Sequence, residues 1–280
     1  MTSLPYVAPD ALLLPERPPA LMRPSPLRRL WGDRLVRIAG VRFVAIGAAR
    51  AAAELVQAAV EGGAGEHIHL ANAYSVALAD AAPELRAQAF EGDAWNLPDG
   101  RPLSWVSHLR RDRPVVRQVR GPQFFLDVCE AGVPHGVKHF LLGAAPEVLE
   151  ILETRLRHRF PGIDIVGSDS PPFRVPTDSE LHARDAAIAA SGAQVVWVGL
   201  GTPKQDIEAA RLAGSLPVRA VAVGAAFDFA AGTLREAPRW MRRIGLEWLF
   251  RFAMEPRRLW RRYVFSNARF LAAVVRTGRR

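Results

Sequence analysis

The chain has 280 residues, of which 49% are apolar and 23% are charged, and its mean hydropathy is close to zero. This composition is typical of a soluble globular protein that is long enough to bury a full core, and it excludes a disordered, collagen-like or polytopic membrane protein. The single cysteine, Cys129, cannot form an intramolecular disulfide or a thiolate zinc cage, which fits a reducing cytosol.

The formal net charge of +9 is concentrated at the C-terminus. Residues 235–280 contain thirteen arginines and three glutamates, a net charge of +10, whereas the other 234 residues carry 24 basic and 25 acidic side chains. A segment with this charge attracts phosphate groups, which occur on nucleic acid, on anionic lipid and on phosphorylated substrates. The charge alone leaves these three kinds of partner open.

Residues 1–33 are predicted to be a proline-rich extension outside the folded domain. Seven prolines fall within residues 1–26, and the short apolar run 11–14 lacks the length and the flanking residues of a signal peptide. No run of 18 uninterrupted apolar residues occurs in the chain, so no transmembrane helix is predicted. Any membrane contact is therefore expected to be peripheral.

Residues 34–234 alternate short apolar runs with helical stretches, which predicts an α/β catalytic domain. The expected fold is an open, mostly parallel, Rossmann-like sheet of five or six strands with helices on both faces. Seven segments have a strand-like apolar pattern, of which five or six are expected in the sheet: residues 41–44, 67–72, 94–100, 139–142, 163–166, 194–200 and 218–223. The predicted helices are residues 48–61, 73–82, 83–90, 146–160, 178–191 and 203–213.

Two polar residues follow predicted strands. Asn72 ends one strand, and Asp99 lies in a Pro-Asp-Gly turn after the next. In open α/β folds, ligands bind at the carboxyl edge of the sheet, where both residues are expected. Taken alone, each residue is explained by local structure, because Asp before Gly is common in turns and Asn is a common helix cap.

The segment VVWVGLGTPKQ at residues 195–205 predicts a buried strand, a glycine-rich turn and the start of a helix, which presents backbone N–H groups to an anion. Lys204 and Gln205 in the first helical turn strengthen the case for a phosphate site. The segment is not a dinucleotide fingerprint, because Lys204 replaces the third glycine and no acidic residue follows about 20 residues later. A nucleotide-dependent oxidoreductase is therefore disfavoured.

The sequence predicts no metal site. The histidine pairs 67/69 and 135/139 are not joined by a cysteine or by suitably spaced carboxylates. The chain also lacks an Asp-x-Asp triplet, so a leaving diphosphate would have to be neutralised by arginine, lysine and helix N-termini.

Residues 235–280 are predicted to be an arginine-rich amphipathic helical appendage. Between residues 246 and 271, an apolar stripe of Leu249, Phe252, Leu259, Tyr263 and Phe270 lies beside a basic stripe of Arg251, Arg258, Arg262 and Arg269. Pro256 is expected to separate two helices or to begin the second. The pattern is typical of a helix at a membrane interface, and it is explained equally well by a helix that packs on the protein with its basic face in solvent.

From about Val36 to Leu271, these segments together resemble the WecG/TagA/CpsF family of bacterial glycosyltransferases, glycosyltransferase family 26. The most specific are GLGTPKQD at 199–206, VGAAFDFAAG at 223–232 and GLEWLFRFAMEPRRLWRRY at 245–263. Supporting segments are GVRF at 40–43, the Asn72 segment, Asp99-Gly100, FLLGAAPEV at 140–148 and PGIDIVG at 161–167.

The resemblance implies an inverting transferase that acts in cell-surface polysaccharide synthesis without a metal or another cofactor. Its donor would be a UDP-sugar, with N-acetylmannosamine, its uronic acid or a related sugar transferred to a polyprenyl-diphosphate-linked saccharide. The reaction would take place at the cytoplasmic face of the cell membrane, with the protein attached peripherally and with no nucleic acid as partner. The oligomeric state is left open.

The resemblance also assigns roles to individual residues. Asp99 would be the general base that removes the proton of the acceptor hydroxyl. The donor and substrate site would comprise Asn72, Gly143, Gly201, Lys204 and Gln205. The leaving diphosphate, the acceptor diphosphate or lipid headgroups would be bound by Arg251, Arg258 and Arg262.

Four segments depart from the family's pattern, which leaves the donor sugar open. The family's Arg-Val-x-Gly-x-Asp is QVRGPQ here, with Gln118 and Gln123 at the Arg and Asp positions and with Arg117 or Arg120 as candidate substitutes. EAP at 236–238 replaces Arg-Ala-Pro, with Arg235 one place early. Leu70 replaces a threonine, and DSPPF at 169–173 replaces His-Gly-Tyr-Phe. The alternative hypothesis is a divergent, non-catalytic protein that binds nucleotides, nucleic acid or anionic lipid through its basic tail.

Overall fold

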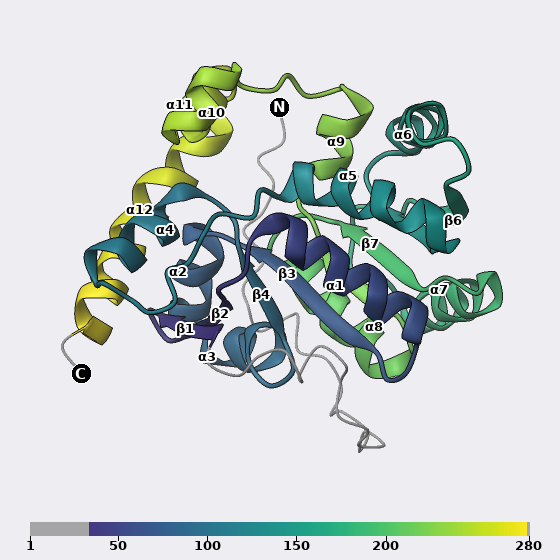
Figure 1. The fold of residues 1–280 in the computed structure, drawn as a ribbon, viewed down its shortest axis with the longest axis horizontal. Helices are drawn as coiled ribbons and strands as arrows, with labels where there is room; N and C mark the ends of the chain where they lie inside the picture. Colours follow the sequence, from purple (N-terminus) through teal and green to yellow (C-terminus); the bar gives the residue numbers. More distant parts are fainter. Residues whose placement is uncertain (1–33, 279–280) are drawn as a thin grey trace.

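The structure is a computed structural model that describes residues 34–278, except for the side chains of Arg243, Arg258 and residues 261–265. The predicted extension, residues 1–33, lies outside the described residues. Figure 1 shows a central sheet enclosed by helices, with the C-terminal helices along one side.

The centre of the fold is a six-stranded sheet in which all neighbouring strands are parallel, in the order β4-β3-β8-β7-β5-β6. The strands are β3 (Glu66–Ala71), β4 (Trp95–Pro98), β5 (Lys138–Gly143), β6 (Asp164–Asp169), β7 (Val195–Gly199) and β8 (Arg219–Ala222). Because the central strands are covered on both faces, they are continuous apolar runs, such as Val195–Val198 at 0% exposure. The predicted α/β class and parallel sheet are confirmed.

Helices cover both faces of this sheet (Figure 1). One face carries α1 (Ala48–Glu61), α5 (Gly121–Gly132), α6 (Pro146–Arg159) and α9 (Ala226–Ala231), which share one apolar cluster with it. The other face carries α7 (Asp178–Ser191) and α8 (Lys204–Ser215). The predicted bounds of α1 and α7 are confirmed; Gly62 follows α1, and Thr177 and Glu180 form a capping box at the start of α7.

The predicted strand 41–44 exists, but it is not part of the parallel sheet. As β2 (Val41–Val44) it pairs antiparallel with β1 (Leu35–Ile38) in a separate hairpin. Ala39 and Gly40 have φ angles of 47° and 86°, which is the geometry of a tight two-residue hairpin turn. An apolar run of four residues does not distinguish a hairpin strand from a sheet strand, and only the turn conformation decides.

A third apolar cluster joins this hairpin to α2 (Ala73–Ala81), to α4 (Arg101–Leu109) and to the short π-helical turn η4 (Arg86–Phe90). The predicted helix 83–90 is therefore two short pieces, α3 (Pro83–Leu85) and η4. Helices α4, α5 and α9 were not predicted. The 3₁₀ turn η5 (Val133–His135) follows α5.

The C-terminal segment forms α10 (Arg239–Ile244), α11 (Glu247–Met254) and α12 (Pro256–Gly278), so Pro256 both separates two helices and begins the second. The end of α12 packs on α2, with Phe270 and Ala273 buried in the shared cluster, and Arg269 pairs with Asp80. Of the predicted apolar stripe, Leu259 and Phe270 are buried while Leu249 is 40% exposed. The end of α12 is thus a helix that packs on the rest of the protein. The predicted boundary between the catalytic domain and the appendage, at residue 235, stays a prediction.

Candidate active site

A cavity of about 1330 Å³ opens at the carboxyl edge of the sheet, where the loops after β3, β4, β7 and β8 meet. Strand order explains this position: the chain moves outward from β3 to β4, continues on the other side with β5 and β6, and then returns through β7 and β8 to the centre. Ligands of open α/β sheets bind at such a reversal. Six predicted site residues line the cavity: Asn72, Asp99, Gly201, Lys204, Gln205 and Arg251.

Asn72 caps α2. Its side-chain oxygen accepts hydrogen bonds from the backbone N–H groups of Tyr74 and Ser75, at 2.9 and 3.3 Å, and the Ser75 hydroxyl accepts one from the Asn72 N–H. The local interpretation of Asn72 as a helix cap is therefore confirmed. A ligand at Asn72 would meet the Nδ2 donor, because the oxygen already accepts two bonds.

Asp99 lies directly after β4. Its N–H donates to the Ala71 carbonyl at 2.8 Å, which holds it against the end of β3, and its carboxylate accepts a hydrogen bond from the Gly121 N–H at the start of α5. Burial raises the pKa of Asp99 to about 6, helped by the negative charge of Glu247 and opposed by Arg120, the Gly121 N–H and Arg251. A carboxyl group with this pKa is suited to accept a proton near neutral pH.

Arg120 is the basic residue that the structure brings to this part of the cavity. It lines the wall beside Gln118, whereas Arg117 is exposed and is not among the described lining residues. The guanidinium binds both carboxylate oxygens of Glu247, at 2.7 and 3.0 Å, and one oxygen of Glu236, at 3.2 Å. Of the two candidate substitutes for the family's arginine, Arg120 is therefore the one at the site.

Arg251 of α11 lies close to Arg120. Both guanidinium groups contact the ring of Phe229, at 5.5 Å from its centroid. Gln123, the other departure in this segment, bonds to Asp127 on the exposed surface of α5. The side chains of Arg258 and Arg262 lie outside the described residues, so their predicted role stays a prediction.

Gln205 holds together the two glycine loops of the cavity. Its side-chain oxygen accepts hydrogen bonds from the N–H groups of Gly201 and Gly224, at 3.1 and 3.0 Å, and its amide donates to the Thr202 hydroxyl at 3.4 Å. Gln205 is 3% exposed. The structure therefore shows a brace between the loops after β7 and β8, and direct contact of Gln205 with a substrate stays a prediction.

Buried histidines hold the first turn of α8 in place. Asp206, the next residue of α8, accepts a bond from His69 at 3.0 Å, and His69 bonds to His67 at 2.8 Å. In the second pair, His139 is buried and structural: it accepts the Trp197 N–H at 3.1 Å, and burial lowers its pKa to about 4, whereas His135 is exposed. Within the described residues, no three His, Cys, Asp or Glu side chains come together as potential metal ligands.

Gly143 ends β5 where this strand approaches β7. A Cβ atom at this position would lie 2.7 Å from the Gly199 backbone, and its φ of 118° also requires glycine. The described wall of the cavity here consists of Ala144, Ala145 and Pro146. The structure thus gives Gly143 a packing role, while its predicted donor contact is untested.

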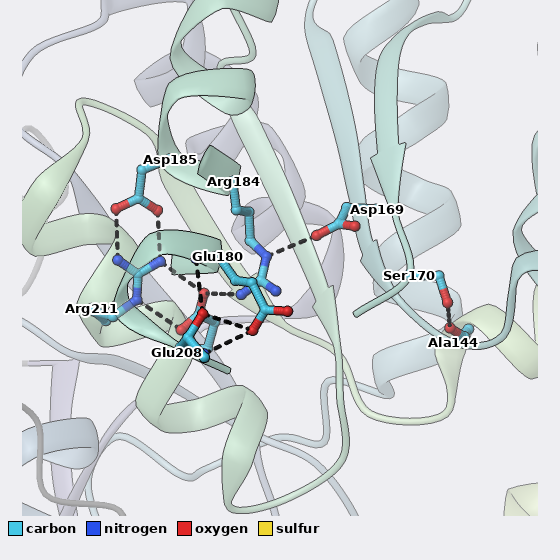
Figure 2. Close-up of polar contacts among 9 residues, drawn as sticks. Ala144, Asp169, Ser170, Glu180, Arg184, Asp185, Glu208 and Arg211 are labelled. Carbon is cyan, nitrogen blue, oxygen red and sulfur yellow. Dashed lines mark hydrogen bonds and ion pairs between the residues drawn. The ribbon is translucent and has the colours of Figure 1, made fainter. Parts of the chain in front are cut away.

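The loop 170–176 forms a wall of the cavity that the sequence did not predict. The Ser170 hydroxyl donates to the Ala144 carbonyl at 2.7 Å, and the exposed Phe173 ring lies 5.4 Å from the ammonium of Lys204. Figure 2 shows how the loop ends are held: Arg184 binds Asp169 and Glu208, Arg211 binds Glu208 and Asp185, and Glu180 takes part in a further ion pair. These partners come from β6, α7 and α8, and the pairs between different elements could not be predicted from a local pattern.

No helix within residues 34–278 has both the length and the apolar content needed to cross a membrane. A protein-family model described as the glycosyl transferase WecG/TagA/CpsF family matches residues 36–280, which includes the sheet, the cavity and the C-terminal helices. This match covers most of the chain and agrees with the predicted family. The chain therefore belongs to the WecG/TagA/CpsF family of glycosyltransferases, enzymes of cell-surface polysaccharide synthesis that act on a sugar donor and an acceptor.

Proposed function

We propose that this glycosyltransferase moves N-acetylmannosamine, its uronic acid or a related sugar from a UDP-sugar to a polyprenyl-diphosphate-linked saccharide, with inversion and without a metal. The observation that carries the proposal is Asp99, a carboxyl group with a pKa of about 6 in a cavity that also holds a lysine at a helix N-terminus. The cavity, at about 1330 Å³, is larger than a usual small-molecule pocket of about 300–1,000 Å³. It has room for a nucleotide sugar and the end of an acceptor.

In the proposed reaction Asp99 acts as general base. An acceptor hydroxyl attacks the anomeric carbon from the face opposite UDP while Asp99 takes the hydroxyl proton. A new carbon–oxygen bond to the acceptor forms, the bond from the anomeric carbon to the diphosphate oxygen breaks, and UDP leaves with its electron pair. A single displacement of this kind inverts the configuration at the anomeric carbon.

Cations and backbone dipoles of the cavity are suited to the charge that develops on UDP. Lys204 and the N-terminus of α8 lie on one wall, and Arg251 lies on another. A helix N-terminus and nearby cations stabilise a diphosphate in the ground state and, more strongly, as its charge increases in the transition state. These groups would take the place that a metal ion has in other transferases.

The surface next to the cavity has features that favour a lipid-linked acceptor. Large apolar side chains are exposed on α4, α10, α11 and α12: Trp105, Leu109, Trp240, Ile244, Trp248 and Trp260, at 41–83% exposure. Trp105, Leu109 and Trp248 also line the cavity. Tryptophan beside arginine is typical of a surface that lies at the boundary of a lipid bilayer, which supports peripheral attachment to the membrane.

The experiment is a thermal-unfolding screen of the full-length protein against UDP-sugars, with GDP- and ADP-sugars as controls. A ligand at about 100 times its Kd stabilises a folded protein by about 2.7 kcal/mol, which shifts Tm by several degrees in a protein of this size. We expect the shift with UDP-sugars alone, and sugar transfer from the best of them to a short-chain prenyl-diphosphate-linked saccharide. Binding of UDP-sugars without transfer to any such acceptor would favour the non-catalytic alternative instead.

A further inference from the structure

Arg120 connects the C-terminal segment to the candidate base. It immediately precedes Gly121, whose N–H binds the Asp99 carboxylate, and the Val119 N–H donates to the Pro98 carbonyl at 2.7 Å. The backbone at Arg120 is therefore held next to Asp99. Its side chain, however, binds two glutamates from beyond residue 235.

Glu247 and Glu236 hold Arg120 in different ways. Glu247 contributes both carboxylate oxygens from the first turn of α11, and its side chain is 22% exposed. Glu236 contributes one oxygen at 3.2 Å, is 37% exposed and shares its other oxygen with Arg242 at 2.7 Å. A two-oxygen pair that is partly shielded from solvent is stronger and more directional than an exposed single contact. Glu247 is thus the main partner of Arg120.

Asp99 is a third carboxylate that interacts with the charge on Arg120, after Glu247 and Glu236. The charged groups that face Asp99 are Glu247 and Arg251 from α11 and Arg120 from the start of α5. Without Glu247, Arg120 would keep only the exposed single-oxygen contact with Glu236, whose other oxygen binds Arg242, and its guanidinium could then also pair with Asp99. Such a pair would occupy the base and weaken its affinity for a proton.

We infer that Glu247 is a positioning residue for sugar transfer: by binding Arg120 it prevents an Arg120–Asp99 ion pair and leaves the Asp99 carboxylate available to the acceptor hydroxyl. The inference rests on the proposed function. It gives α11 a role in catalysis that is separate from phosphate or membrane binding, since the acting side chain is acidic. The position of α11 decides whether Glu247 reaches Arg120. Docking of the C-terminal segment therefore also controls whether the Asp99 carboxylate can accept a proton from the acceptor.

The two acidic residues provide a matched comparison. Glu247→Gln keeps the size of the side chain and removes its charge, so Arg120 is released towards Asp99. The pKa of the base falls for two reasons, because the negative charge of Glu247 is lost and because Arg120 is released, and the acid limb of the kcat profile moves to lower pH. The plateau value of kcat is expected to fall by about tenfold or more, since a general base contributes on the order of 10²–10⁴-fold. The double variant Glu247→Gln/Arg120→Gln has no guanidinium to pair with Asp99 and is expected to recover the plateau kcat; a plateau as low as in Glu247→Gln alone would overturn the inference.

Glu236→Gln is the control, because it also removes a carboxylate from Arg120 but does not face Asp99. The acid limb of the kcat profile of Glu236→Gln is expected at the same pH as in the wild-type protein. Glu247→Asp keeps the charge with a shorter reach and is expected to restore the limb towards the wild-type position. Calorimetry with UDP and thermal unfolding of each variant show whether the fold and the donor site are intact.

The outcomes separate the inference from the function on which it rests. If the wild-type protein transfers sugar and the acid limbs of Glu247→Gln and wild type coincide, the inference is wrong and the proposed function stands. Equal shifts of the acid limb in Glu247→Gln and Glu236→Gln would also overturn the inference, because the loss of any nearby negative charge would then explain the effect. A wild-type protein that transfers no sugar would overturn the proposed function and the inference together.

Discussion

At the scale of single residues, the surroundings of Asp99 determine its chemistry more than its place in a turn does. A Pro-Asp-Gly turn on a protein surface leaves the carboxyl at its ordinary pKa near 4. Here burial at the end of β4 and the charge of Glu247 raise that pKa to about 6. The ionised form accepts the proton, so activity is expected to rise as the pH increases through about 6 and to be lost below it.

Replacing Asp99 tests this role directly. Asp99→Asn is expected to lower turnover by on the order of 10²-fold or more and to leave UDP binding largely intact, because a general base acts in the transition state and contributes little to ground-state affinity. Turnover is measured with the donor found in the screen, and UDP affinity by calorimetry. Near-normal turnover of the variant would show that Asp99 is a turn residue without a catalytic role.

Two segments that depart from the expected family pattern contact each other through Arg120. The chain has Glu236 where the family has arginine and Gln118 where the family has another arginine. The structure joins the substituted segments through the Arg120–Glu236 contact at 3.2 Å, with Glu247 as the stronger partner. Arg120 thus places a positive charge at the cavity, and Glu236 and Glu247 of the C-terminal segment balance it.

At the scale of elements, the start of α8 combines a binding residue with a brace. Lys204 is partly exposed in the cavity, whereas Gln205 is buried and holds Gly201 and Gly224. Both positions follow the same turn, and sequence analysis gave both the same role. Their environments now separate them.

The substitutions Lys204→Ala and Gln205→Ala are both expected to weaken UDP binding, but for different reasons. Loss of Lys204 removes a cation at a helix N-terminus and is expected to leave Tm unchanged. Loss of Gln205 removes the shared acceptor of the Gly201 and Gly224 N–H groups, two hydrogen bonds that contribute about 0.5–1.5 kcal/mol each, and is expected to lower Tm as well. Calorimetry with UDP and thermal unfolding distinguish the two, and wild-type affinity in both variants would make the turn purely structural.

At the scale of the whole molecule, the C-terminal segment has two surfaces. The end of α12 packs on α2 through Phe270, while α10 and α11 carry exposed tryptophans and place Arg251 and Glu247 at the cavity. This arrangement favours a segment that completes the site and also contacts lipid. An anchor that only supplied charge would not need these inward contacts.

Charge-conserving substitutions separate these two roles. Arg258→Lys and Arg262→Lys are expected to preserve liposome binding, since a lysine contributes as much as an arginine, about 1 kcal/mol on anionic lipid. The same substitutions are expected to lower sugar transfer, since the planar guanidinium that binds a diphosphate is lost. Arg269→Lys is the matched control, because Arg269 pairs with Asp80 on α2. Deleting residues 235–280 is expected to abolish both activities; full-rate turnover of a soluble short-chain acceptor by the truncated protein would show that the segment is an anchor only.

Local chemistry determined much of this protein directly from the sequence. The bounds of α1 and α7, the parallel sheet and the edge where Asn72, Asp99 and Gly201 meet all follow from apolar periodicity, caps and turn residues, whose effects extend over a few neighbours. The choice of Arg120 over Arg117, the brace formed by Gln205 and the inward-facing Glu247 depend on residues that are 19 to 127 positions apart. Only the tertiary structure decides such contacts, because side chains distant in sequence take their charges, partners and burial from the packing of separate elements.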